Sequence, residues 1–220
     1  MNPTALLHLL QLASPSLPVG AYSYSQGLES AIECGRVRCP DSAARYLARQ
    51  LADVLAPWDG AVFWRLLAAC SAGDGATFGQ WNARYLASRE SAELRAETVQ
   101  MGYSLSRLLA ELDLVPAAGM RDTCLPAALA QAMHALGVPH EEALLAMLFS
   151  WAENQVLVCV KSIPLGQVAG QRLLLALRPD IERAAAAARA LADDELSSWA
   201  PGSTALSMSH EVQIGRLYRS

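Results

Sequence analysis

Apolar residues recur at helical spacing along most of this 220-residue chain. The clearest case lies between residues 90 and 114, where they follow one another in steps of four and three, while most charged residues fall elsewhere on the predicted helix. Such a stripe predicts a long helix packed along a neighbour. Its members are Leu94, Thr98, Met101, Leu105, Leu108 and Leu112, with Glu93, Glu97 and Arg107 among the residues off the stripe.

The segment from Leu144 to Val160 is apolar nearly all round, which is typical of the buried centre of a bundle. Nearer the N-terminus, Thr4 is expected to cap the first helix, and Gly35 is expected to end the second. Pro57 is expected in the first turn of a new helix. The remaining helices are predicted at 4–13, 23–34, 40 to about 58, 57–73, 76–87, 125–136, 164–177 and 179–193, with loops at 14–20 and 116–124.

The last stretch, residues 201–220, begins with Pro-Gly and shows no period, so it is predicted to be an extended tail. No repeat and no linker divides the chain. The predicted fold is therefore all-α: a single-domain helical bundle over 1–220, with about ten helices and an extended C-terminal tail.

Composition agrees with the helical pattern and narrows the class of protein. Ala (40 residues) and Leu (35) make up about a third of the chain, whereas Val, Ile and Thr together number 21. The net charge of -4 argues against a basic nucleic-acid binder. Five cysteines without a CxxC pair fit reduced thiols and a cytoplasmic protein. No unbroken apolar run reaches the length of a membrane span.

Motifs that carry enzyme chemistry are missing from the sequence. There is no GxxxxGK[ST], no HExxH and no GxSxG, and the four histidines are not paired at metal-ligand spacing. We therefore expect no catalytic residue, no metal site and no cofactor. Two alternatives stay open: a generic helical adaptor, and an all-α enzyme with an acid-lined pocket.

Three stretches are unusual, and each has a purely structural alternative. In SPSLPVGAYSYSQGLE (14–29), Ser23 or Ser25 could cap a helix while the tyrosines pack on the core. In VKSIPLGQVAGQ (160–171), Lys161 could satisfy the carbonyls that end a helix, and the glycine pair could permit close approach of a second element. The tail SMSHEVQIGRLYRS could be disordered, although Arg and Tyr are frequent at binding hot spots.

Together these stretches resemble the UreF family of urease accessory proteins. The similarity includes SPSLPVGAYSYSQGLESAIE, RAETVQMGYSL (95–105), AENQVLVCVKSIPLGQVAGQ (152–171) and the tail, and it extends over residues 5–220. The resemblance implies an all-helical protein that dimerises and is not an enzyme. It also implies binding to UreD (called UreH in some organisms), recruitment of the GTPase UreG, and coupling of GTP hydrolysis to nickel insertion into apo-urease.

The resemblance also implies which residues meet partners. The tail, within a partner-binding segment 201–220, is expected to bind UreD/UreH. The other two motifs are expected to shape the surface used by UreG and by the dimer. The tail residues are Ser207, Met208, His210, Glu211, Arg216, Leu217, Arg219 and Ser220; the others are Tyr22, Ser23, Glu29, Lys161, Pro164, Gly166, Gln167 and Gln171.

The tail departs from the family pattern at a few positions. Ser209 stands where Arg is common, Ile214-Gly215 where Tyr-Ser is common, and Tyr218 where Phe is common. Loss of a buried charged hydrogen bond at position 209 would weaken a tail contact by about 1–3 kcal/mol. A partner that has changed to match would leave the contact intact.

Overall fold

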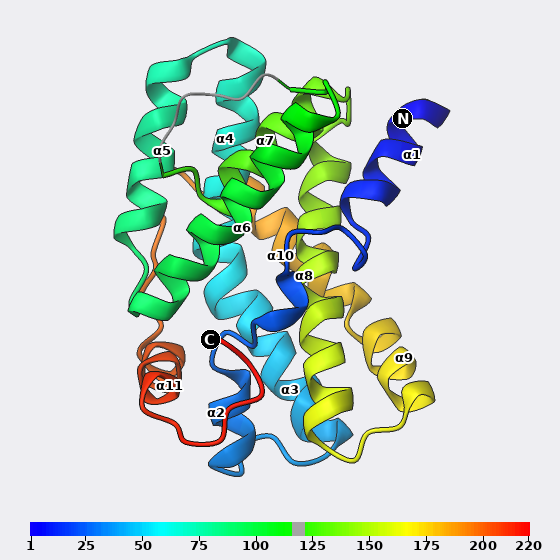
Figure 1. Cartoon of the computed structure of the whole chain (residues 1–220), viewed down its shortest axis with the longest axis vertical. Coiled ribbons are helices and arrows are strands. Elements are labelled where there is room, and N and C mark those ends of the chain that lie inside the picture. Colours follow the sequence, from blue (N-terminus) through cyan, green and yellow to red (C-terminus); the bar gives the residue numbers. More distant parts are fainter. Residues whose placement is uncertain (116–121) are drawn as a thin grey trace.

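The computed structural model describes residues 1–115 and 122–220, and in these residues all regular structure is helical, as the sequence predicts (Figure 1). The predicted loop at 116–124 falls mostly outside the described residues. The helices are α1 (Pro3–Leu12), α2 (Leu28–Glu33), α3 (Pro40–Gln50), α4 (Ala61–Ala72), α5 (Gly75–Ala87), α6 (Ala92–Glu111), α7 (Leu125–Ala135), α8 (His140–Ser162), α9 (Gln167–Ala176), α10 (Arg178–Ala190) and α11 (Pro201–Glu211), with a 3-10 turn η1 (Ala21–Ser23) and a π-helical segment η2 (Leu51–Gly60).

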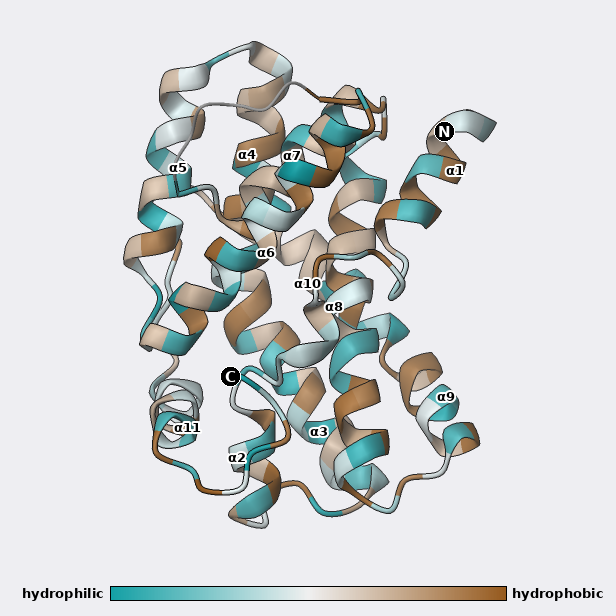
Figure 2. Cartoon of the chain, viewed as in Figure 1, coloured by the Kyte–Doolittle hydropathy of each residue, from teal (hydrophilic) through white to brown (hydrophobic). Residues whose placement is uncertain are grey.

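Helix α8 runs through the middle of the molecule (Figure 1). It contacts α2, α4, α7, α9 and α10, so apolar residues on several of its sides are buried. By length and composition α8 could cross a membrane, but half of its most apolar window is buried inside the fold. This is the behaviour expected of the central helix of a bundle, and Figure 2 shows polar and apolar residues mixed around the outer helices.

The predicted boundary at Pro57 is wrong, because one continuous helical run extends from α3 through η2 into α4. Pro57 lies inside η2, where the wider π-helical turn accommodates a residue that cannot donate a backbone hydrogen bond. Helix α10 packs on this segment. A Cβ at Gly60 would lie 3.2 Å from Ala188 Cβ, so the alanine run 184–188 lets two helices approach closely.

Two local details at the N-terminal end also differ from the prediction. The cap of α1 is Asn2, whose side chain accepts a hydrogen bond from Ala5 N at 2.7 Å, rather than Thr4. Helix α2 begins at Leu28 rather than near Ser23, because Gln26 and Gly27 adopt left-handed backbone conformations (φ 54° and 80°) that a helix cannot continue through.

Of the two glycines in VKSIPLGQVAGQ (160–171), only one lies where a second helix approaches closely. A Cβ at Gly170 would lie 2.6 Å from the Val160 side chain, so this glycine allows α9 to pack tightly on α8. A Cβ at Gly166 would meet nothing within 4 Å. The close-approach interpretation is therefore confirmed for Gly170 only.

Candidate functional site

The end of the chain is not simply extended. Residues 201–211 form α11, and only residues 212–220, which we call the C-terminal segment, lack regular structure. Figure 1 shows this segment turning back from α11 past α2 toward the centre of the fold. Helix α11 packs on α2 and α6. The sequence predicted no helix here because its buried residues, Leu206, Ser207 and His210, include a single aliphatic side chain.

His210 anchors α11 between two carboxylates. Its side chain is fully buried, with Nδ1 2.7 Å from Glu93 Oε2 and Nε2 3.1 Å from Glu29 Oε2. The imidazole therefore joins an acid on α2 to an acid on α6 through both of its ring nitrogens.

Glu29 also holds the C-terminal segment by its backbone. It is 6% exposed, and its two oxygens accept hydrogen bonds from Leu217 N at 2.7 Å and Tyr218 N at 3.1 Å. The chain packs closely here. A Cβ at Gly27 would lie 3.1 Å from Ser207 N, so the start of α2 and the middle of α11 are in backbone contact.

The final residues complete the network through the first motif. The Ser220 carbonyl oxygen accepts hydrogen bonds from the backbone N–H groups of Ser25 (2.8 Å) and Gln26 (3.1 Å) and from the Ser25 hydroxyl. Arg219 N donates to Ser23 O at 2.9 Å. The turn at Gln26, whose backbone is left-handed, thus points the N–H groups of Ser25 and Gln26 at Ser220.

Glu97 is the deepest acid of this network. It is 3% exposed and accepts hydrogen bonds from Ser220 Oγ and Gln26 Nε2, both at 2.6 Å. Burial raises the pKa of Glu97 from 4.5 to about 7, although these hydrogen bonds and the Arg89 charge lower it in part. We call Glu29, Glu93, Glu97 and His210 the tail-docking site.

The raised pKa of Glu97 predicts a pH dependence of stability. The folded state binds this proton up to about pH 7, whereas the unfolded state releases it near 4.5. The contribution of Glu97 to stability therefore decreases as the pH rises through that window. We expect Glu97→Gln to gain stability relative to the wild type as the pH rises, in urea unfolding measured at several pH values. Parallel pH profiles for the two proteins would contradict this.

Other predicted tail residues support the helices. Glu211 Oε1 accepts hydrogen bonds from Ala92 N (2.8 Å) and Glu93 N (3.3 Å). These N–H groups lie in the first turn of α6, where a helix offers its own donors no acceptor. Ser207 Oγ lies 2.7 Å from the hydroxyl of Ser91, the cap of α6. Arg216 forms an ion pair with Glu93. Each of these three tail residues therefore contacts α6, Ser207 from a buried position and Glu211 and Arg216 from exposed ones.

The tail also presents apolar side chains to solvent. Met208, Val212, Ile214 and Leu217 are 53%, 82%, 94% and 72% exposed, respectively. Leu217 is fixed by its own backbone contact to Glu29, although its side chain points away from the fold. The docked tail is thus held by polar contacts together with buried Leu206 and Tyr218, while these four apolar side chains remain uncovered. We call these four residues the exposed tail set.

Two departures from the family pattern have structural counterparts. Gly215 has φ 77°, a left-handed conformation that favours glycine and turns the segment back toward α2. Ser209 is exposed, and its hydroxyl donates to Ala205 O within α11 at 2.8 Å. No described contact of Ser209 reaches another element.

The two predicted groups of partner residues are not cleanly separated. Ser23 and Glu29 contact the C-terminal segment directly, whereas Tyr22 is 60% exposed beside them. Lys161, Pro164, Gly166, Gln167 and Gln171 are all exposed around the junction of α8 and α9. Tyr218 is buried, which raises its pKa, and it lies near Ser162, the neighbour of Lys161, although the hydroxyls of Tyr218 and Ser162 have no hydrogen-bond partner among the described residues.

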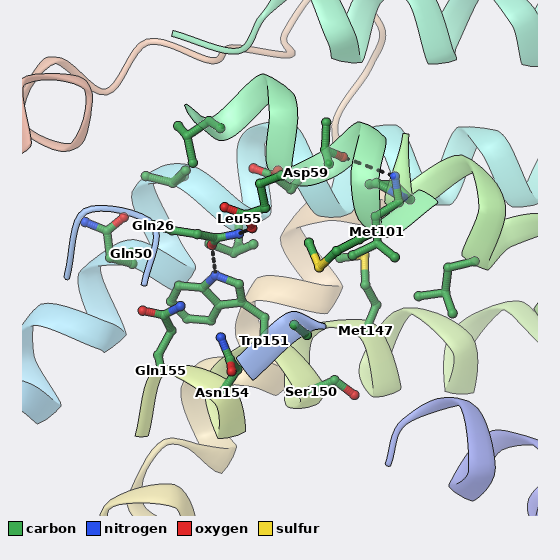
Figure 3. A pocket seen from close by; sticks show the side chains of 18 of the residues that line it. Gln26, Gln50, Leu55, Asp59, Met101, Met147, Ser150, Trp151, Asn154 and Gln155 are labelled. Carbon is green, nitrogen blue, oxygen red and sulfur yellow. Dashed lines mark hydrogen bonds between the residues drawn. The ribbon is translucent and has the colours of Figure 1, made fainter. Parts of the chain in front are cut away.

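A cavity of about 230 Å³ lies beside the tail-docking site (Figure 3). Gln26 joins the two, because its side chain donates to Glu97 and its Oε1 accepts from Trp151 Nε1 at 2.7 Å. Gln155 also faces the cavity; it is 2% exposed and its Nε2 has no protein partner. The cavity therefore has amide groups among its apolar walls, next to the anchored end of the tail.

Sequence reasoning missed the acids on α6. Glu93 and Glu97 were both assigned to the polar side of the predicted stripe, yet both belong to the tail-docking site. Thr98, Met101 and Leu105 of that stripe are buried as predicted, whereas Leu112 is 47% exposed. The sequence signal that could have pointed to Glu97 was its place in RAETVQMGYSL, one of the blocks that carry the family resemblance.

The fold and site together define an all-α protein whose main polar network binds a segment of its own chain. Within 1–115 and 122–220, no group of three or more His, Cys, Asp or Glu side chains is placed to hold a metal ion. These features define a class of all-α protein that holds its own C-terminal segment in a buried polar site. Comparison with known proteins identifies the family.

The family model for UreF matches residues 37–178. The urease accessory protein UreF of Janthinobacterium sp. (strain Marseille) is 57% identical over 226 residues, covering 100% of both chains. The UreF proteins of Nitrosospira multiformis and Azoarcus sp. (strain BH72) are 56% and 49% identical, covering 98% of this chain and 98% and 95% of theirs. The chain therefore belongs to the UreF family of non-enzymatic urease accessory proteins, which act in urease maturation.

Proposed function

We propose that this protein is the scaffold that bridges UreD/UreH and the GTPase UreG and couples GTP hydrolysis to nickel insertion into apo-urease. It acts in the cytoplasm, as a homodimer and without a cofactor of its own; nickel is the cargo of the assembly. The observation that carries the proposal is the docked tail, whose exposed tail set is fixed in place by the buried tail-docking site.

The tail side of the proposal is contact with UreD/UreH through residues 201–220. Apolar side chains that are exposed on a rigid support lose little conformational entropy when a partner covers them. Here the support consists of α11 and the backbone contacts of Leu217, Tyr218 and Ser220. Ser207, His210, Glu211 and Arg216 contribute by holding this surface, and Met208 and Leu217 contribute by direct contact.

The second side of the proposal is contact with UreG, or with the other protomer, at the junction of α8 and α9. Lys161 is exposed in the last turn of α8, and the polar residues that follow it are exposed as well. Tyr22 adds an exposed aromatic side chain close to the docked tail. Tyr218 of the tail lies near Ser162, so the two surfaces of the proposal are neighbours.

Reconstitution from purified components tests the proposal. The chain, UreD/UreH and UreG should co-elute from a sizing column, and the chain should restore nickel-loaded, active urease in cells that carry the cognate urease cluster without its own UreF gene. Three separate peaks under conditions in which known partners assemble would overturn the bridging role. Normal urease activation in cells lacking the chain would favour a generic adaptor instead.

Lys161→Ala tests whether the Lys161 charge contacts a partner or only compensates the end of α8. As an interface charge, Lys161 should contribute to urease activation, and we expect a loss of about tenfold, equivalent to about 1.4 kcal/mol of binding. The free energy of unfolding should change by less than about 0.5 kcal/mol, as is usual for exposed positions. Urease activity in the complementing cells and urea unfolding of the purified chain measure the two effects.

Arg107→Ala is the matched control for Lys161→Ala. Arg107 is an exposed base in a surface ion pair with Glu111 on α6, a helix whose main contacts are with α7 and α11. It should leave both activation and unfolding nearly unchanged. If Lys161→Ala lowers stability while activation survives, Lys161 only compensates the end of α8.

A further inference from the structure

Three helix ends meet at the opposite end of the molecule from the tail: the ends of α4 and α7 and the start of α8 (Figure 1). Two histidines converge there on one hydroxyl. His140 Nε2 lies 2.7 Å from Ser71 Oγ, and His134 Nδ1 lies 3.4 Å from the same atom. The three residues come from three different helices, so folding rather than local sequence brings them together.

The His140 ring has a fixed orientation. It packs edge-on against Trp64, with ring centroids 5.6 Å apart at 89°. The Arg189 guanidinium lies over the Trp64 ring, 6.0 Å from its centroid, and forms an ion pair with Glu141. His134 is exposed in the last turn of α7, so its side chain is free to adjust. One imidazole is thus held while the other can move toward it.

The surroundings favour a cation between the two rings. Ser71 and His134 lie in the last turns of α4 and α7, where helix dipoles present partial negative charge. Glu141 and Glu142 offset the opposite dipole at the start of α8.

We propose that His134 Nδ1 and His140 Nε2 bind one divalent first-row transition-metal ion, which replaces the Ser71 hydroxyl between the two nitrogens. Imidazole nitrogens suit Zn²⁺ and Cu²⁺, and water completes the coordination. Cys70 precedes Ser71 in the sequence, but no described contact joins its thiol to either histidine, and it is not assigned as a ligand. The site would link the end of α7 to the start of α8, and this role is independent of the proposed partner surfaces.

Metal titration of the purified full chain tests this inference. With Zn²⁺ in competition with a chromophoric chelator at neutral pH, we expect one ion per chain. His134→Ala and His140→Ala should each weaken its binding by about tenfold or more. Cu²⁺ bound at one equivalent should give an electron paramagnetic resonance spectrum with coupling to two imidazole nitrogens, and each variant should lose one of them.

His8→Ala is the control for a non-specific surface histidine. His8 lies near the same turn, with Nδ1 3.2 Å from Leu136 O, but it does not contact Ser71. It should bind the metal as the wild type does. Unchanged Zn²⁺ affinity in both His134→Ala and His140→Ala, or a wild-type Cu²⁺ spectrum with fewer than two nitrogens, would overturn the site. Circular dichroism of the metal-free variants checks that both remain folded.

Discussion

Replacing His210 with alanine should lower the free energy of unfolding by roughly 3–5 kcal/mol, the range typical of leaving a buried carboxylate without its partner. The imidazole is fully buried and within 3.1 Å of acids on both α2 and α6. Its removal leaves Glu29 and Glu93 without the imidazole that hydrogen-bonds to both of them. Urea unfolding followed by circular dichroism measures the loss.

The same variant should release the C-terminal segment before the bundle unfolds. Glu29 holds two backbone N–H groups of the segment, so disturbing this acid disturbs the docking itself. We expect hydrogen exchange of residues 212–220 to lose its protection, while the amides of α8 keep theirs. Persistent protection of the segment would mean that the contacts of Ser220 hold it without His210.

Ser209→Ala is the control one residue away. Ser209 is exposed on α11 and hydrogen-bonds only within that helix in the described structure. Its substitution should change the free energy of unfolding by less than about 0.5 kcal/mol. If His210→Ala behaves like Ser209→Ala, the buried network does not stabilise the docked tail.

The fold was predictable wherever apolar spacing alone decides helix position. Helix α8 is apolar nearly all round and is central, and the middle of the α6 stripe is buried. The failures have local causes. The π-helical segment η2 carries Pro57 without a break, and nothing in the sequence signals that wider turn. Helix α11 buries serine and histidine, which apolar periodicity does not count.

The site was predictable in part, because its two ends are in motifs that carry the family resemblance. Glu29 and His210 were both selected, but as members of two different partner surfaces. Glu93, which contacts His210, is 117 positions away from it in the sequence, and Glu97 is 123 positions from Ser220. A glutamate becomes a core residue only when such a distant donor reaches it, and periodicity places it on the polar side of its helix.

Ile214→Ser and Leu217→Ser together should abolish most of the binding to UreD/UreH while leaving the chain folded. Ile214 and Leu217 are 94% and 72% exposed, so serine removes apolar contact area without opening a cavity. We expect the dissociation constant to rise by about tenfold or more, as for truncated hot-spot residues. The free energy of unfolding should stay within about 0.5 kcal/mol of the wild type, because the Leu217 N–H contact to Glu29 is retained.

Leu7→Ser is the matched control for the tail variant, since Leu7 is an exposed leucine (65%) on α1, far from the tail. Affinity for immobilised UreD/UreH, measured for the wild type, the tail variant and Leu7→Ser, decides the outcome. Equal affinities would show that the exposed tail set is not the contact surface. A loss restricted to the tail variant, with hydrogen exchange of residues 212–220 still protected, would separate the two tasks of the tail: polar side chains dock it, and apolar side chains meet the partner.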